Sequence, residues 1–157
     1  MPVALLLPAI QLLHPMPGVI TQGVRANHPA IDIACTPGTP VRAAHDGNGR
    51  SERSYTHGIT FVLQGADGLQ TSYSHLQSAA PRGTYRRGAV IGHCGNTGIW
   101  SSGPHLHFAS NRPNLLGSLL RDDNPALAVS SSSPAMAAQP PTARPIGGSP
   151  TALKTMP

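Results

Sequence analysis

The sequence is poor in charge, in aromatic side chains and above all in carboxylates. Of its 157 residues 11% are charged and 4% are aromatic, and Glu52 is its single glutamate. A hydrolase of the His-Glu-x-x-His type needs a glutamate beside its histidine ligands, so this sequence excludes that class. The eight histidines are the main candidates for proton transfer in any metal-dependent hydrolysis.

Long apolar runs and dense basic clusters are also missing. The first thirteen residues, MPVALLLPAIQLL, are apolar but too short to span a bilayer, and no basic residue precedes Arg25. We read residues 1–16 as a leader segment without a clear signal peptide, and we expect no membrane span. The formal charge is +5, but an RNP-like motif and a Cys-Cys-His-His finger are both absent, so nucleic acid is not an expected partner.

Cysteine is scarce as well. Cys35 and Cys94 are the two cysteines, too few to form a metal motif by themselves. They form either one disulfide in an oxidising compartment or two small buried thiols, and both readings stay open.

Glycine and proline, by contrast, are abundant at 17 residues each. They punctuate turns and interrupt helices, so they favour short strands joined by loops. Asp67-Gly68 and Asp46-Gly47 mark turns. The sequence therefore predicts an all-β fold of antiparallel sheets or a sandwich, with strands near 19–21, 31–33, 41–44, 59–63, 70–75, 88–92 and 105–109.

The chain divides into four parts on this reading. Residues 17–110 form the folded domain, and residues 111–129 form a short extension with one short helix. Residues 130–157 are rich in Ser, Pro and Ala and hold almost no large apolar side chains. Such a segment buries too little surface to offset its ordering entropy, so we expect a disordered tail.

The stretch His105-Leu106-His107-Phe108 is the most informative one. Side chains alternate along a strand, so the two histidines share one face while Leu106 and Phe108 anchor the other in the core. One histidine can then bind a metal ion while the other reaches the water on it.

Two further elements carry candidate ligands. In a straight strand His28 and Asp32 would lie about 13 Å apart, too far to share one ion, so the chain must bend near Pro29. Tyr73 and His75 are expected to share a face at the end of another strand.

These motifs together resemble the lysostaphin/LytM family of zinc endopeptidases. The similarity covers Pro17 to Phe108 and rests on runs in the order of the chain. These are His28-Pro-Ala-Ile-Asp32, Gly38-Thr-Pro-Val41, Ala43-Ala-x-Asp-Gly47, Tyr73-x-His75-Leu76, Gly95-Asn-Thr-Gly98 and Gly103-Pro-His-Leu-His-Phe108. The resemblance implies an antiparallel β-fold with a substrate groove.

Site roles follow from the resemblance position by position. It implies that His28, Asp32 and His107 bind one Zn²⁺ and that His75 and His105 are catalytic. The implied substrate is a peptide bond in the stem peptides or cross-bridges of peptidoglycan. Gly95, Gly98 and Gly103 would floor the groove, and Trp100 lies in the same loop.

The sequence departs from the family at two positions. Alanine replaces glycine at position 30, which would be unfavourable if that position needs a positive φ. His45 stands where the family has another residue. His45 is assigned no role, nor are His14, His57 and His93.

Other readings remain open. A catalytically weak or inactive domain of this family would act as a wall-binding or regulatory module. A non-haem iron oxygenase would also use two histidines and a carboxylate, but would leave His75 and His105 without a purpose. Taken alone, the stretch from Gly38 to Gly47 suggests a structural β-barrel carrier module.

We expect a monomer that works outside the cell or in the cell envelope, or a phage-encoded lysin or virion component.

Overall fold

The computed structural model describes residues 9–121, and the predicted tail at 130–157 lies outside them. Every strand pair is antiparallel, as the sequence predicts. Within residues 9–121, nine strands are accompanied by two 3-10 segments, η1 (Ala66–Gly68) and η2 (Pro113–Gly117). The strands are β1 (Ile20–Gln22), β2 (Ala30–Ala34), β3 (Pro40–Arg42), β4 (Gly47–Ser54), β5 (Gly58–Gln64), β6 (Gln70–Ala79), β7 (Gly83–Tyr85), β8 (Val90–Cys94) and β9 (His105–Ser110).

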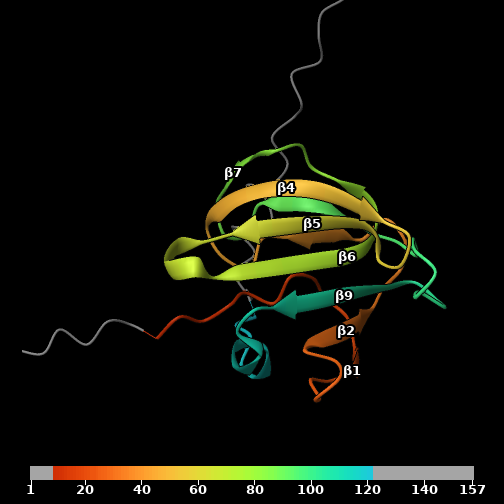
Figure 1. The fold of residues 1–157 in the computed structure, drawn as a ribbon, viewed down its shortest axis with the longest axis horizontal. Helices are drawn as coiled ribbons and strands as arrows, with labels where there is room; N and C mark the ends of the chain where they lie inside the picture. The colour runs from red at the N-terminus through yellow and green to blue at the C-terminus, as the bar shows by residue number, and fades with distance from the viewer. Residues whose placement is uncertain (1–8, 122–157) are drawn as a thin grey trace, which may run out of the picture.

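Strand β6 is the centre of the sheet. The order β1-β2-β9-β6-β5-β4-β7 runs across the molecule, with β8 joining β6 to β3 (Figure 1). The first half of β6 pairs with β9 through Thr71 to Ser74, and its second half pairs with β8 from Leu76 onward. His75 therefore lies where β6 changes partners.

The core follows the period of the strands. Leu106 and Phe108 are fully buried while His105 and His107, which alternate with them, are only half-buried, and this confirms the predicted alternation in β9. Tyr73 stacks near Phe108 with a ring-centroid separation of 5.0 Å. Leu12, Met16 and Leu116 join the same core cluster, so the packed unit extends beyond residues 17–110 at both ends.

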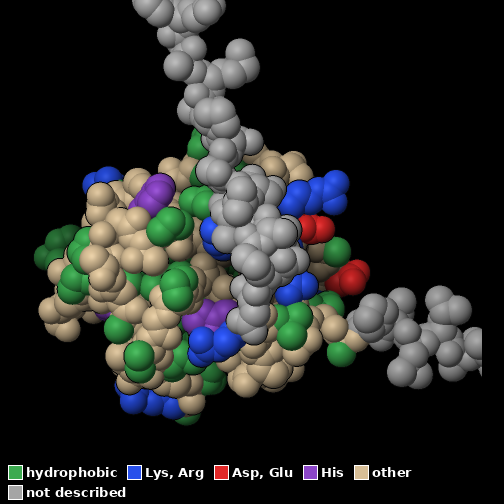
Figure 2. All heavy atoms as spheres, turned by 180° about the vertical axis from the view of Figure 1, so that it is seen from behind, with side chains coloured by type: hydrophobic (Ala, Val, Ile, Leu, Met, Phe, Trp, Pro, Cys, Tyr) green, Lys and Arg blue, Asp and Glu red, His purple; other side chains and the backbone are tan. Residues whose placement is uncertain are grey.

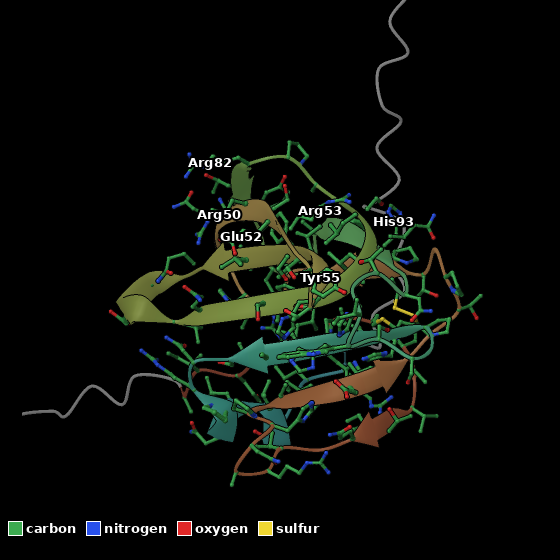
Figure 3. The ribbon with its side chains drawn as sticks, turned by 45° about the vertical axis from the view of Figure 1, so that its right-hand side comes forward. Arg50, Glu52, Arg53, Tyr55, Arg82 and His93 are labelled. Carbon is green, nitrogen blue, oxygen red and sulfur yellow. A yellow bond between two sulfur atoms is a disulfide. The ribbon has the colours of Figure 1, made fainter. Side chains whose placement is uncertain are left out.

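Two strands were not foreseen from the sequence. Strand β4 begins where a turn was predicted at Asp46-Gly47, and β7 pairs along its edge. Most of β4 is exposed, and Arg50 forms an ion pair of 2.7 Å with Glu52 (Figure 3). Because its residues are polar on both faces, β4 has no apolar period that would reveal it.

On the face drawn in Figure 2, basic side chains lie in several places with few acidic ones among them.

Among residues 9–121, no helix has the length and apolar character needed to cross a membrane. A short helix is predicted within residues 111–129, and the described part of that segment contains the 3-10 helix η2.

The two cysteines form a disulfide, which decides between the two readings of the sequence. Cys35 directly follows β2 and Cys94 ends β8, 59 residues later. The backbone N–H of Cys35 also donates to Pro104 O at 3.3 Å, next to the start of β9. The disulfide therefore links the end of β2, the strand that carries Asp32, to the end of β8.

Removing this disulfide should lower stability strongly. Closing a loop of 59 residues restricts the unfolded chain, which is worth about 4 kcal/mol in the chain-entropy account. We expect the Cys35→Ala/Cys94→Ala protein to lose about 2–4 kcal/mol of unfolding free energy in urea titrations. Equal unfolding midpoints for this variant, the oxidised parent and the reduced parent would contradict a stabilising bond.

Candidate metal centre

Asp32 and His107 face each other across β2 and β9. They are direct partners in the strand register, so both side chains stand on the same side of the sheet. Asp32 is flanked by the buried Ile31 and Ile33, which confirms that the carboxylate points away from the core. The Nδ1 atom of His107 lies 2.9 Å from Oδ1 of Asp32.

His28 reaches the same carboxylate from a tight turn. Arg25 and His28 exchange backbone hydrogen bonds of 3.0 and 2.9 Å, which folds the chain back before β2 begins at Ala30. The Nε2 atom of His28 consequently lies 3.4 Å from Oδ1 of Asp32. The chain therefore turns just before His28, and the side chains of His28 and Asp32 meet as the prediction requires.

The concern about Ala30 is wrong. Among the described residues, only Asp67 and His75 have a positive φ without being glycine. Ala30 is fully buried in β2 and pairs with Ala109 of β9. Its methyl group is part of the core and requires no left-handed backbone.

The three side chains fit a divalent metal ion. Their ligand atoms all lie within 4.8 Å of one another. Ligands of a tetrahedral zinc ion with bonds near 2.1 Å are about 3.4 Å apart, close to the separations measured from Asp32. Nδ1 of His28 donates to Gly23 O at 3.1 Å, which leaves the Nε2 lone pair for a metal.

The surroundings of Asp32 favour the ionised form of its carboxyl group. Burial alone would raise the pKa of its carboxyl group, but the hydrogen bond from His107 and the nearby His107, His105 and His28 lower that pKa below its ordinary value. An ionised carboxylate is the form that binds a metal ion.

His75 and His105 stand beside this group with their rings held from behind. Nδ1 of His75 donates to Thr97 O at 2.7 Å, and Nδ1 of His105 donates to Gly103 O at 2.8 Å. Carbonyl oxygens only accept, so the Nδ1 atoms carry hydrogen and the Nε2 atoms are available. The two ring centroids are 4.7 Å apart, and Nε2 of His105 lies 4.0 Å from Oδ1 of Asp32.

The predicted shared face of Tyr73 and His75 is wrong. Tyr73 packs in the core, whereas the ring of His75 contacts those of His105 and His107. His75 has a φ of 63°, and a left-handed residue interrupts the alternation of a strand. The interruption turns His75 toward the site and Leu76 into the core.

Burial lowers the pKa of His75 to about 4, with smaller contributions from His105, His107 and His57. The hydrogen bond to Thr97 acts in the opposite direction without reversing the shift. At neutral pH the ring is therefore uncharged and can accept a proton at Nε2.

His57 is a member of the cluster that the sequence did not indicate. Its ring lies 5.9 Å from that of His75, 5.5 Å from that of His107 and 4.9 Å from that of Trp100. Burial and then His107 lower its pKa. It lies in the turn between β4 and β5, and because the sequence predicts no strand over residues 48–54, the neighbours of His57 could not be inferred.

The remaining histidines lie elsewhere. His45 is buried and shares a hydrogen bond of 2.9 Å with Thr71, whose hydroxyl donates to Tyr73. His93 shares one of 3.0 Å with Ser78. His14 is tied by its backbone N–H to Leu120 O.

Gly95 and Gly98 allow close packing of the loop against other parts of the protein. A Cβ on Gly95 would meet the backbone of Gln77 at 2.5 Å, and one on Gly98 would meet Thr56 O at 2.4 Å. These glycines let the loop pack onto β6 and onto the turn between β4 and β5. A Cβ on Gly103 would meet nothing within 4 Å.

Residues 26–115 match the model of peptidase family M23. A relative in Neisseria meningitidis, DD-carboxypeptidase/endopeptidase Mpg, is 42% identical over 83 residues, which is 52% of this chain and 19% of that protein. The chain thus spans about a fifth of the length of this curated relative.

Solved structures resemble the fold as well. A zinc containing peptidase from Vibrio cholerae aligns with a TM-score of 0.60 at 25% identity, covering 64% of this chain and 36% of that one. The antimicrobial peptidase lysostaphin from Staphylococcus simulans aligns with a TM-score of 0.51 at 27% identity, covering 82% and 55%.

Proposed function

The chain belongs to peptidase family M23 and is a metallopeptidase by that membership, and from this premise we propose that it hydrolyses peptide bonds of peptidoglycan with one bound zinc ion. The observation that carries the proposal is the meeting of His28, Asp32 and His107 within 4.8 Å beside two further imidazoles. Two nitrogens and one carboxylate oxygen leave a fourth tetrahedral position for water, as a catalytic zinc site requires.

Each side chain then has a distinct part. His28, Asp32 and His107 hold the metal, which when bound lowers the pKa of water and polarises the scissile carbonyl. His75 and His105 act through Nε2: one accepts the proton of the attacking water and later passes it to the leaving amine, and the other, when its Nε2 carries a proton, donates a hydrogen bond to the developing oxyanion. The backbone carbonyls of Thr97 and Gly103 fix both rings in the required tautomer.

The substrate class rests on the relatives. One is named as a carboxypeptidase and endopeptidase and another as an antimicrobial peptidase. We propose stem peptides or cross-bridges of peptidoglycan as the substrate, and the cell envelope or the exterior of the cell as the place of action. The disulfide is consistent with an oxidising compartment.

Metal removal and wall digestion test this function together. Elemental analysis should find about one zinc per chain. Hydrolysis of purified peptidoglycan should stop after dialysis against a chelator and return when one equivalent of zinc is added. Mass spectrometry of fragments from walls with different cross-bridges would identify the bond.

An inactive wall-binding or regulatory module would give a different result. It would bind peptidoglycan but release no fragments at any zinc concentration. Release of peptide fragments by the protein after its metal has been removed would instead contradict the metal-dependent mechanism.

A further inference from the structure

The turn between β4 and β5 is locked onto the loop that precedes β9. The N–H of Ile99 donates to Tyr55 O at 3.0 Å, and the N–H of Trp100 donates to Thr56 O at 3.1 Å. A Cβ on Gly58, which has a φ of 65°, would meet Thr97 at 2.3 Å. The turn at residues 55–57 and the loop at residues 95–104 are therefore held together beside the site histidines, and we call this unit the wall.

His57 and Trp100 are two ring side chains of this wall that contact each other. The ring of His57 lies between that of Trp100, at 4.9 Å, and that of His75, at 5.9 Å and nearly parallel to it. Its Nδ1 pairs with the hydroxyl of Thr56 at 3.0 Å, which leaves Nε2 for another partner. Trp100 remains 64% exposed.

Neither side chain is explained by the metal. Among the described residues, the group whose atoms can share one ion consists of His28, Asp32 and His107 and does not include His57. Nor does core packing explain them, since the indole is mostly exposed and His57 is only half-buried. An aromatic ring beside an available ring nitrogen suits a ligand with both apolar and amide surface.

We propose that His57 is a substrate-positioning residue, which hydrogen bonds the peptide backbone through Nε2 while Trp100 covers the same stretch of peptide on one side of the scissile bond. This inference rests on the proposed function. A backbone amide that loses water on binding needs a new hydrogen-bond partner, and His57 supplies one within reach of the metal position.

Kinetics on a soluble cross-linked peptide that the parent cleaves provides the first test. His57→Ala should raise KM about 5- to 10-fold, the effect of losing one net hydrogen bond, and leave kcat within about threefold. His57→Gln keeps a polar group of similar reach and should recover most of the loss. His57→Phe keeps the ring without nitrogen and should resemble His57→Ala.

The single tryptophan gives a readout that does not depend on turnover. Adding the same peptide to a His105→Ala protein should change the Trp100 emission, and adding His57→Ala to that background should weaken the Kd about 5- to 10-fold. Zinc content should stay unchanged. His93→Ala, which removes a histidine of β8 labelled in Figure 3, is the matched control and should equal the parent.

The outcomes separate this inference from the function on which it rests. If His57→Phe behaves as the parent while His57→Gln is impaired, the ring only packs and the inference is overturned. An unchanged KM and Kd in His57→Ala overturns it as well. If the zinc-loaded parent cleaves none of the cross-linked peptides offered to it, the proposed function itself fails.

Discussion

Replacement of His107 by alanine is expected to remove the metal and the activity together. The change deletes a nitrogen that lies 2.9 Å from Asp32, and leaves His28 and Asp32 as two ligands. A bound metal supplies several kcal/mol of transition-state stabilisation, so turnover should fall by more than about 10³-fold. Elemental analysis and hydrolysis assays on the same preparation measure both losses.

The matched control for this change is again a histidine outside the site. His93→Ala removes the same group from the surface of β8 and should keep both zinc and activity. Circular dichroism of the metal-free proteins verifies that the His107→Ala chain is folded. A folded His107→Ala protein with one zinc and full activity would exclude His107 as a ligand.

Replacement of His105 by alanine should separate chemistry from metal binding. Its Nε2 lies 4.0 Å from Asp32, beyond hydrogen-bond distance, and its ring adjoins that of His75. Loss of acid–base assistance typically costs roughly 10²–10⁴-fold, so kcat should fall by that factor while zinc content remains near one. Steady-state kinetics with elemental analysis measures both.

A change in loop structure would mimic this result and needs its own control. The hydroxyl of Ser101 contacts His105 Nδ1 at 3.2 Å and Asn96 at 2.6 Å, so Ser101→Ala perturbs the same loop while it keeps the imidazole. We expect less than a tenfold loss of kcat in Ser101→Ala, as for one neutral hydrogen bond. Equal losses in the two variants would assign the effect to the loop.

Local periodicity accounts for what the sequence predicts well. The alternation in β9 separates His105 and His107 from Leu106 and Phe108, and the same rule aims Asp32 away from the core. These inferences depend on regular strands, which is why they agree with the structure.

The features that the sequence predicts wrongly or not at all lie where strands are irregular or lack an apolar period. His75 departs from the alternation of side chains along β6 because its φ is positive, and no neighbouring residue in the sequence indicates this conformation. Strand β4 is polar on both faces, so its pairing with β5 and β7 is decided by tertiary contacts. The position of His57 in the site could not be predicted for the same reason, because the neighbours of a turn residue depend on where the flanking strands lie.

The change of partners along β6 has a consequence for how this chain can evolve. The backbone at residue 75 adopts a conformation that glycine tolerates best, yet its ring is turned toward the other histidines by that very conformation. A glycine there would relax the main chain and delete the imidazole. Selection for stability would therefore favour glycine at position 75, whereas selection for hydrolase activity would favour histidine.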